Sequence, residues 1–188
     1  MLRLFVAVDL PASEQQAVAA LCTDVHGARF TKHHQLHVTL RFMGGTPEED
    51  LPLIRQRLAL VEAPTFHLAR HGVGVFPPGA RKPRVLWLGL EPAEPLLRLK
   101  SEIDRVLDAV PVEHPHEAKR EFAPHLTLAR LGGRPDESLT RFLARHAAYR
   151  GAEWKVACFR LYRSTLHASG AVHDTIATYP LSEICREQ

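Results

Sequence analysis

Two short segments of the sequence carry the same residues that can transfer protons and bind phosphate. The first, HVTL, contains His37 and Thr39, and the second, HLTL, contains His125 and Thr127. An imidazole has an unperturbed pKa of about 6.5, so near neutral pH it can donate or accept a proton. A threonine hydroxyl can donate a hydrogen bond to a phosphate oxygen. Two such segments acting together could open a phosphodiester with water, because one histidine can take a proton from water while the other protonates the leaving oxygen.

The two segments lie within a longer internal repeat. Residues 36–45 (LHVTLRFMGG) and 124–133 (PHLTLARLGG) share five of ten positions, and the two histidines are 88 residues apart. In each copy the pattern predicts a strand that stops at Gly-Gly and is followed by a helix opening with proline and acidic residues. Agreement in both sequence and context predicts two related lobes, each contributing one His-x-Thr strand.

Alternation along a strand predicts which of these side chains share a face. Successive side chains point to opposite faces, so His37 and Thr39 lie on one face of their strand, and His125 and Thr127 lie on one face of theirs. If the lobes pack around a pseudo-two-fold axis, the two polar faces meet across a cleft. That cleft would hold two imidazoles and two hydroxyls.

Two arginines near these segments could balance the charge of a phosphate. Alternation places Arg41 on the same face as His37, whereas Arg130 needs a local twist to reach the face of His125. The same parity turns Phe42 away from His37 and into the core. A basic loop, Arg81-Lys82-Pro83-Arg84, is either a solvated charge run or a surface that steers RNA.

The elements that must position these residues alternate between strands and helices. Apolar alternation and turn residues predict the strands, whereas helical spacing and start signals such as Ser13, Thr46 and Pro47 predict the helices. A polar loop is expected at 111–121. We expect strands at 2–10, 34–43, 66–75, 84–90, 122–131, 154–166 and 172–181, and helices at 14–25, 47–63, 94–110 and 135–148.

The composition is that of an ordinary globular protein. Of 188 residues, 45% are hydrophobic and 24% are charged, which excludes a collagen-like, low-complexity or wholly disordered chain. The formal charge of +3 is compatible with an anionic substrate. Three widely spaced cysteines without a CxxC pair predict no disulfide framework and no Cys-based zinc site. With no apolar run near the roughly 20 residues of a membrane span, we expect a cytoplasmic protein.

The paired motifs resemble the HxTx motifs of the 2H phosphoesterase superfamily. The greatest likeness is to the bacterial and archaeal RNA 2′,3′-cyclic phosphodiesterases, historically called 2′-5′ RNA ligases (LigT-like). The resemblance covers nearly the whole chain, including the opening segment RLFVAVDLP, the block FAPHLTLAR and the late segment LYRSTL. Family members often carry an aromatic residue in the stretch that follows LYRSTL. This sequence departs from the family there, because that stretch contains His173.

The resemblance implies a fold class, an activity and residue roles. The implied fold is α+β and bilobal, with antiparallel sheets lining a central cleft and helices outside. It forms a single domain over 1–188. Its two intertwined lobes carry one HxTx motif each, at 37–40 and 125–128. The activity is metal-free hydrolysis of an RNA 2′,3′-cyclic phosphate end to a 2′-phosphomonoester, with weak reverse 2′-5′ ligation. His37 would be the proton donor and His125 the proton acceptor, while Thr39, Thr127 and Arg130 would bind phosphate. No cofactor is expected.

The expected partner is RNA with a 2′,3′-cyclic phosphate end, with tRNA halves as one source, and we expect a monomer that does not bind membranes. Three alternatives remain open at this point. The chain could be a non-catalytic module that binds RNA ends, or a 2H phosphodiesterase acting on another 2′-5′ or cyclic nucleotide substrate. It could also be a His-based metallohydrolase, although neither motif has a neighbouring carboxylate or second histidine suited to hold a metal.

Overall fold

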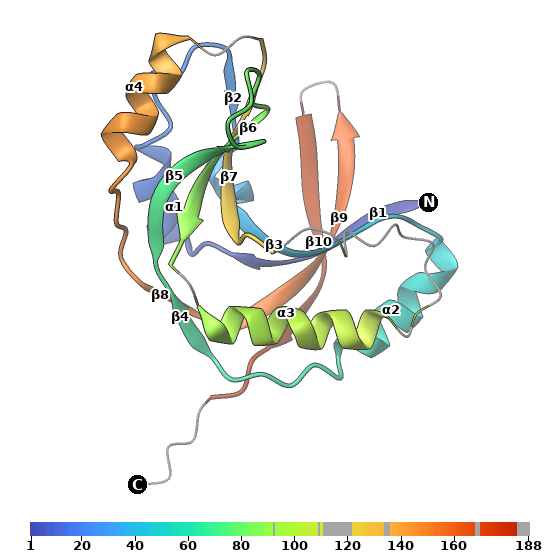
Figure 1. The fold of residues 1–188 in the computed structure, drawn as a ribbon. Coiled ribbons are helices and arrows are strands. Elements are labelled where there is room, and N and C mark those ends of the chain that lie inside the picture. The colour runs from blue at the N-terminus through green and yellow to red at the C-terminus, as the bar shows by residue number, and fades with distance from the viewer. Residues whose placement is uncertain (92, 109, 111–121, 134–135, 168–169, 184–188) are drawn as a thin grey trace, which may run out of the picture.

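The computed structural model describes residues 1–188 except 92, 109, 111–121, 134–135, 168–169 and 184–188. The polar loop expected at 111–121 therefore lies outside the described residues. The chain folds as an α+β protein around an antiparallel sheet (Figure 1), which confirms the expected class. None of the described helices is long and apolar enough to cross a membrane.

Eight strands form one sheet, and two short strands form a second. The order in the large sheet is β10-β9-β1-β3-β7-β6-β5, with β2 also paired to β7, and all of its pairs are antiparallel. The small sheet pairs β4 with β8. The strands are β1 (Leu2–Asp9), β2 (Ala28–Phe30), β3 (His37–Thr46), β4 (Phe66–Leu68), β5 (Arg70–Phe76), β6 (Val85–Leu90), β7 (His125–Leu131), β8 (Trp154–Val156), β9 (Cys158–His167) and β10 (Gly170–Pro180).

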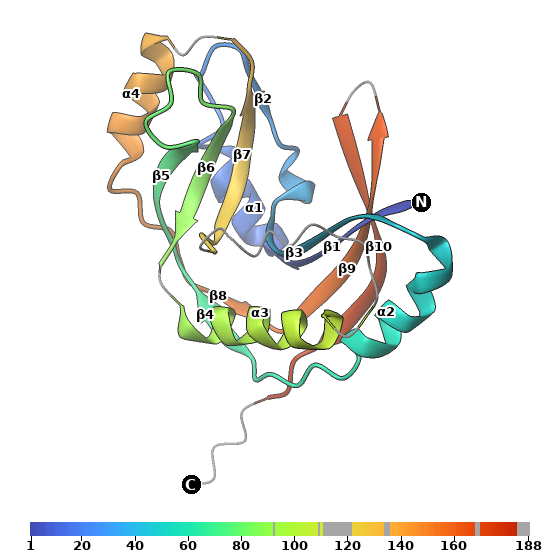
Figure 2. The same ribbon diagram turned by 45° about the vertical axis from the view of Figure 1, so that its right-hand side comes forward.

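The large sheet has two halves that meet at one pair of strands. One half contains β10, β9, β1 and β3, and the other contains β7, β6, β5 and β2. They are joined by β3 and β7, whose register contains the pair Val38 and Leu126. From there the two strands diverge to opposite sides (Figure 2). Because β9 and β10 come from the end of the chain but complete the half that contains β1, the two halves are intertwined in sequence.

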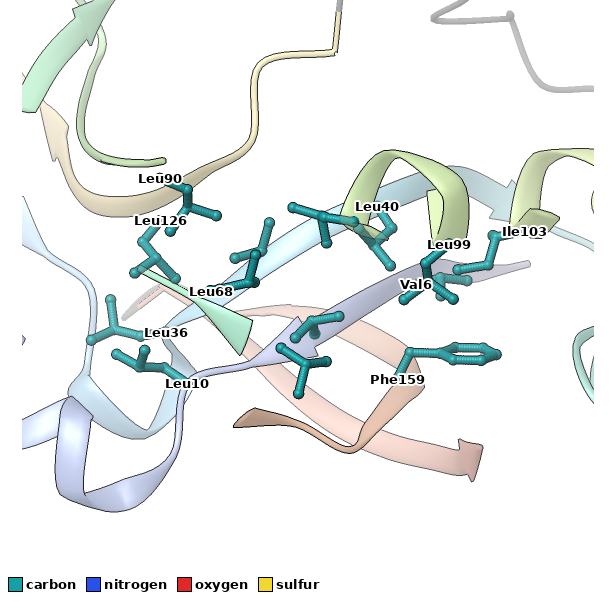
Figure 3. Packing of buried hydrophobic residues seen from close by; sticks show 14 of the residues in the cluster. Val6, Leu10, Leu36, Leu40, Leu68, Leu90, Leu99, Ile103, Leu126 and Phe159 are labelled. Atoms are coloured by element: carbon teal, nitrogen blue, oxygen red, sulfur yellow. The ribbon is translucent and has the colours of Figure 1, made fainter. Parts of the chain in front are cut away.

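Helices flank the sheet and contribute the other layer of the core. They are α1 (Ala12–Ala19), α2 (Leu51–Leu58), α3 (Glu94–Leu107) and α4 (Glu137–His146), with short 3-10 turns η1 (His33–Gln35) and η2 (Glu48–Asp50). In α3 the apolar residues recur every three or four positions, and Leu96, Leu99 and Ile103 are fully buried. Figure 3 shows Leu99 and Ile103 lying near Leu40 and Val6 of the sheet.

Most expected elements are present, and the differences have local causes. Each of the seven expected strand regions contains observed strand. The helix expected at 14–25 ends at Ala19, and the one expected from Thr46 begins at Leu51. Thr46 was wrong as a helix cap, because it is fully buried as the last residue of β3 and pairs with Leu2. Strand β2 was not predicted, since its three residues are too few to show alternation.

Candidate active site

The two His-x-Thr segments lie side by side at the junction of the two sheet halves. Val38 pairs with Leu126, and both side chains are fully buried in the core. Because side chains alternate along a strand, the residues on either side of this pair point to the other face of the sheet. His37 and Thr39 therefore flank Val38 on that face, and His125 and Thr127 flank Leu126. All four are partly exposed.

Each histidine is held by the same backbone contact. Nδ1 of His37 lies 2.7 Å from the carbonyl oxygen of Gln35, and Nδ1 of His125 lies 2.8 Å from that of Ala123. A carbonyl can only accept a hydrogen bond, so Nδ1 carries the proton in both rings. This leaves Nε2 of each imidazole to accept a proton when the ring is neutral, or to donate one when it is charged.

Aromatic rings surround His37. Its ring lies 4.9 Å from that of Phe5 and 6.3 Å from that of Tyr162, measured between ring centroids. The His173 ring meets it edge-on at 5.3 Å, with an interplanar angle of 87°. The Tyr162 hydroxyl donates a 2.6 Å hydrogen bond to Asp9, the residue that pairs with His37 across β1 and β3. These contacts restrict the orientation of the His37 ring.

His125 is supported by aromatic rings from the other half of the sheet. Its ring lies 5.0 Å from that of Phe76 in an edge-on arrangement, and Phe76 lies 5.3 Å from Trp87. Trp87 pairs with Thr127 on one side and with Gly74 on the other. A side chain at Gly74 would collide with the indole, because its Cβ would lie 2.2 Å from Trp87. Gly74 therefore leaves room for the indole ring.

Burial lowers the pKa of both histidines. For His37 the pKa falls to about 4, chiefly by desolvation, with smaller lowering by the charges of His173 and His125 and an opposing effect of the Gln35 carbonyl. The pKa of His125 is lowered by desolvation and by the charge of Arg130, against the effect of the Ala123 carbonyl. The two imidazoles are thus close enough for one charge to affect the other ring. Both are poised to be neutral until an anion enters.

Each copy of the repeat contains a β-bulge at its second leucine. In β7, Thr127 pairs with Trp87 and Ala129 with Leu86, so Leu128 is an extra residue. In β3, Thr39 pairs with Ala7 and Arg41 with Val6, so Leu40 is extra in the same way. An inserted residue reverses the alternation of side chains beyond it. The bulges therefore decide which residues after each HxTL segment share the face of the histidines.

The bulge in β7 brings Arg130 to the histidine face. Leu128 and Ala129 are both fully buried, and Arg130, the next residue, is exposed. Its charge contributes to the low pKa of His125. The bulge is therefore the local twist that Arg130 was expected to need in order to reach the face of His125.

The bulge in β3 has the opposite consequence for Arg41. The parity argument that put Arg41 beside His37 is wrong, because the extra residue turns this side chain to the face covered by α3. There its guanidinium donates 2.9 Å hydrogen bonds to Asp104 and to Asp108. Phe42, which parity had assigned to the core, is instead 39% exposed and pairs with Phe5 on the histidine face.

Sequence reasoning also missed one basic residue near this face. Arg29 lies in β2 and pairs directly with Arg130 of β7. No sequence signal marked it, since β2 itself was not predicted. His173 was noted only as a departure from an aromatic position, and the structure places it against His37.

Metal ligands do not gather within the part of the chain that the structure describes. Among those residues, no three His, Cys, Asp or Glu side chains form a group that could hold a metal ion. The polar groups that face the junction are imidazoles, hydroxyls, a guanidinium and the carboxylate of Asp9, which accepts a hydrogen bond from Tyr162. That set can transfer protons and neutralise a phosphate.

Comparisons with known proteins agree with this arrangement. The model of the 2′-5′ RNA ligase superfamily matches residues 10–168. An RNA 2′,3′-cyclic phosphodiesterase from Thermus thermophilus is 37% identical over 198 aligned residues, covering 100% of this chain and 94% of the relative. A protein of the same name from Archaeoglobus fulgidus is 30% identical over 182 residues, covering 95% of this chain and 99% of the relative.

Solved structures show the same fold. A crystal structure of a Thermus thermophilus protein superposes with a TM-score of 0.79 at 33% sequence identity, covering 97% of this chain and 99% of the other. LigT from E. coli in its apo form superposes with a TM-score of 0.75 at 23% identity, covering 97% and 98%. The match of the family model over most of the length, together with these relatives, places the paired HxTx strands in a known context. The chain belongs to the 2′-5′ RNA ligase superfamily.

Proposed function

We propose that this protein hydrolyses the 2′,3′-cyclic phosphate at the end of an RNA to a 2′-phosphomonoester. The observation that carries the proposal is the matched pair of imidazoles at the β3–β7 junction, each with Nδ1 bound to a carbonyl and Nε2 left to react. The names of the relatives, RNA 2′,3′-cyclic phosphodiesterase, supply the substrate class.

In the proposed reaction the oxygen of water forms a bond to phosphorus and the bond from phosphorus to O3′ breaks. Nε2 of neutral His125 takes a proton from the attacking water. Nε2–H of charged His37 gives its proton to O3′, so the products are a 3′-hydroxyl and a 2′-phosphomonoester. Each imidazole ends in the protonation state opposite to its starting state, and proton exchange with solvent restores both.

Three further side chains would hold the phosphate. Thr39 and Thr127 lie on the histidine face and can donate their hydroxyl protons to the non-bridging oxygens. Arg130 would neutralise the negative charge. Arg41 is not part of this proposal, because its guanidinium is bound to two aspartates on the other face.

The low pKa of His37 suits a proton donor once the phosphate is present. In the empty site a pKa of about 4 keeps this ring neutral at pH 7. A phosphodiester anion beside it favours the charged form and raises the pKa. Substrate binding therefore charges His37, which can then donate its proton. When the anionic product leaves, the charged form of His37 loses this stabilisation.

The test uses RNA bearing a 2′,3′-cyclic phosphate end, with and without EDTA. We expect turnover without metal, a 2′-phosphomonoester as the product, and a loss of kcat of about 10²–10⁴ for His37→Ala and for His125→Ala. Near wild-type rates in both variants would refute the two-histidine mechanism. Binding without turnover by the wild type would instead support an RNA-end binding module, and loss of activity in EDTA would support a metallohydrolase.

The separate roles can be tested with a leaving group that needs no proton. In a substrate with sulfur in place of O3′, the leaving thiolate is a weak base. We expect this substrate to restore most of the rate of His37→Ala and little of the rate of His125→Ala. Rescue of His125→Ala alone would reverse the assignment of donor and acceptor.

The wider proposal concerns the setting of this reaction. The chain would act as a single domain over 1–188, as a monomer in the cytoplasm, on RNA ends such as those of tRNA halves. If the 5′-hydroxyl of a second RNA took the place of water as the nucleophile, the same groups would support weak joining of RNA ends through a 2′-5′ linkage, with O3′ again leaving and taking its proton from His37.

A further inference from the structure

A basic pocket lies beyond the histidines, at the end of β7 where Arg130 stands. It has a volume of about 640 Å³, and its lining includes four cationic side chains. They come from separate parts of the chain: Arg29 from β2, Lys82 and Arg84 from the segment between β5 and β6, and Arg130 from β7. Strand pairing brings them together, because β7 pairs with both β2 and β6.

These four cations form no ion pair with any carboxylate in the described part of the protein. No ion pair or side-chain hydrogen bond involves any of them there. Arg29 and Arg130 are direct cross-strand partners, and like charges in that position destabilise a sheet. By contrast, Arg41 in the other copy of the repeat is paired with two carboxylates. Four clustered cations that form no ion pair among the described residues would favour an anion in the pocket.

The pocket and the site proposed above share Arg130. Arg130 lines the pocket, and its charge also lowers the pKa of His125. A strand advances about 3.3 Å per residue, so Thr127 and Arg130 are roughly 10 Å apart along β7. An anionic chain that begins at the histidines can therefore continue past Arg130 into the pocket.

We propose that Arg29, Lys82 and Arg84, which line this pocket together with Arg130, bind the phosphodiester that precedes the terminal nucleotide of the RNA, while Arg130 serves the cyclic phosphate. The inference rests on the proposed function, because a cyclic phosphate occupies the 3′ end and every other phosphate of the substrate lies on its 5′ side. The preferred substrate is then an oligonucleotide rather than a mononucleotide.

The lining also indicates which part of the RNA is bound. None of the described residues that line it is aromatic, since those other than the four cations are Pro83, Leu131 and Gly133. Base recognition in single strands relies on stacking against aromatic rings, whereas arginine and lysine bind phosphate irrespective of sequence. The pocket should therefore raise the affinity for longer RNA without selecting a particular base.

The test compares three substrates with a terminal 2′,3′-cyclic phosphate: a mononucleotide, a dinucleotide, and the same dinucleotide with a neutral methylphosphonate linkage. For the wild type we expect kcat/KM on the charged dinucleotide to exceed that on the neutral one by about tenfold. In the double variant Arg29→Gln, Arg84→Gln this ratio should fall to near one, while kcat/KM on the mononucleotide changes less than about twofold.

A matched control removes the same charge elsewhere. Arg55→Gln with Arg57→Gln changes two arginines on α2, at the other end of the molecule (Figure 1), and should keep the tenfold ratio. On longer RNA the pocket variant should also weaken the dependence of log kcat/KM on log salt by about 0.7 for each phosphate that it no longer neutralises. Its Tm should be unchanged or higher, since a like-charge pair is removed.

The outcomes separate this inference from the proposed function. If the wild type hydrolyses none of the three substrates, the proposed function fails. If it hydrolyses all of them with no preference for the charged linkage, or if the pocket variant keeps that preference, the function stands and the phosphate pocket is refuted. If the pocket variant keeps its preference for the charged linkage but no longer binds poly-glutamate, the pocket is assigned to an acidic protein partner. That outcome would equally overturn the proposal.

Discussion

At the scale of single residues, the protein sets the tautomers of His37 and His125 through the backbone. The carbonyl oxygens of Gln35 and Ala123 each accept a hydrogen bond from the Nδ1–H of the histidine two residues later in the chain. The Gln35 side chain in turn donates a hydrogen bond to the carbonyl of Ala171 in β10, which ties this turn to the far edge of the sheet. A main-chain partner adds no titrating group, so the titrating neighbours that lower the pKa of His37 are the imidazoles of His173 and His125.

The lowered pKa values predict how the rate depends on pH. The proposed mechanism needs one charged and one neutral imidazole, so kcat/KM should follow a bell whose two limbs belong to the pair. Both pKa values lie below the usual 6.5, with that of His37 at about 4, so the maximum should lie below pH 6.5. The profile of kcat should lie at higher pH, because the bound phosphate raises both values. A kcat/KM profile with its maximum above pH 7 would contradict these assignments.

A single variant checks the sign of this effect. The charge of Arg130 lowers the pKa of His125, so Arg130→Gln should move one limb of the kcat/KM profile to higher pH. It should also reduce the rate, since the phosphate then has one cationic partner fewer. Reduced activity with an unshifted profile would place Arg130 too far from the imidazole to affect it.

At the scale of elements, the two bulges give the related strands different surroundings. Leu40 and Leu128 are the extra residues at equivalent positions of the repeat. Two residues later the strands carry Phe42 and Arg130, both on the histidine face. The same backbone irregularity therefore presents an aromatic ring in one half and a guanidinium in the other, which makes the two sides of the site unlike.

Arg41 provides a test of this account. Its ion pairs with Asp104 and Asp108 join β3 to α3, and its side chain is 22% exposed. Arg41→Gln should lower the free energy of unfolding by about 1 kcal/mol, or the Tm by about 2–4 °C, and should change kcat/KM less than about twofold. Arg130→Gln is the matched change in the other strand, and it should reduce kcat/KM at an unchanged Tm. A tenfold loss of activity in Arg41→Gln at an unchanged Tm would return Arg41 to the site.

At the scale of the whole molecule, the site depends on how the two sheet halves are joined. The junction rests on the buried pair Val38 and Leu126, with a histidine next to each. Leu126 lies in the same apolar cluster as Leu36 and Leu90 (Figure 3), so core packing on one face sets the spacing of the imidazoles on the other.

Shortening Leu126 should therefore affect stability and chemistry together. Leu126→Ala removes a fully buried side chain and should cost about 2–5 kcal/mol of unfolding free energy. Leu99→Ala in α3 removes an equally buried leucine away from the junction and should cost a similar amount. Measured well below the Tm of both, only Leu126→Ala should also lose kcat/KM. Equal activity of the two variants would show that the junction does not control the spacing.

The sequence by itself determined most of the elements and the choice of the proposed reacting groups. Period-two alternation marked β1, β3, β6 and β7, and the repeat singled out His37 and His125 as a pair. These signals are local, since they depend on the chemistry of neighbouring residues along one strand or helix. Segment 94–110 was predicted as a helix for the same reason, and the structure confirms it as α3.

Only the tertiary structure decided what lies around those groups. The faces of Arg41, Phe42 and Arg130 depend on one inserted residue in each strand, and an insertion is defined only relative to the partner strand. The basic pocket likewise exists because β2 and β6 both pair with β7, which brings together residues more than 100 positions apart, such as Arg29 and Arg130. Register between distant segments is set by packing of the whole core, and no pattern within a single segment records it.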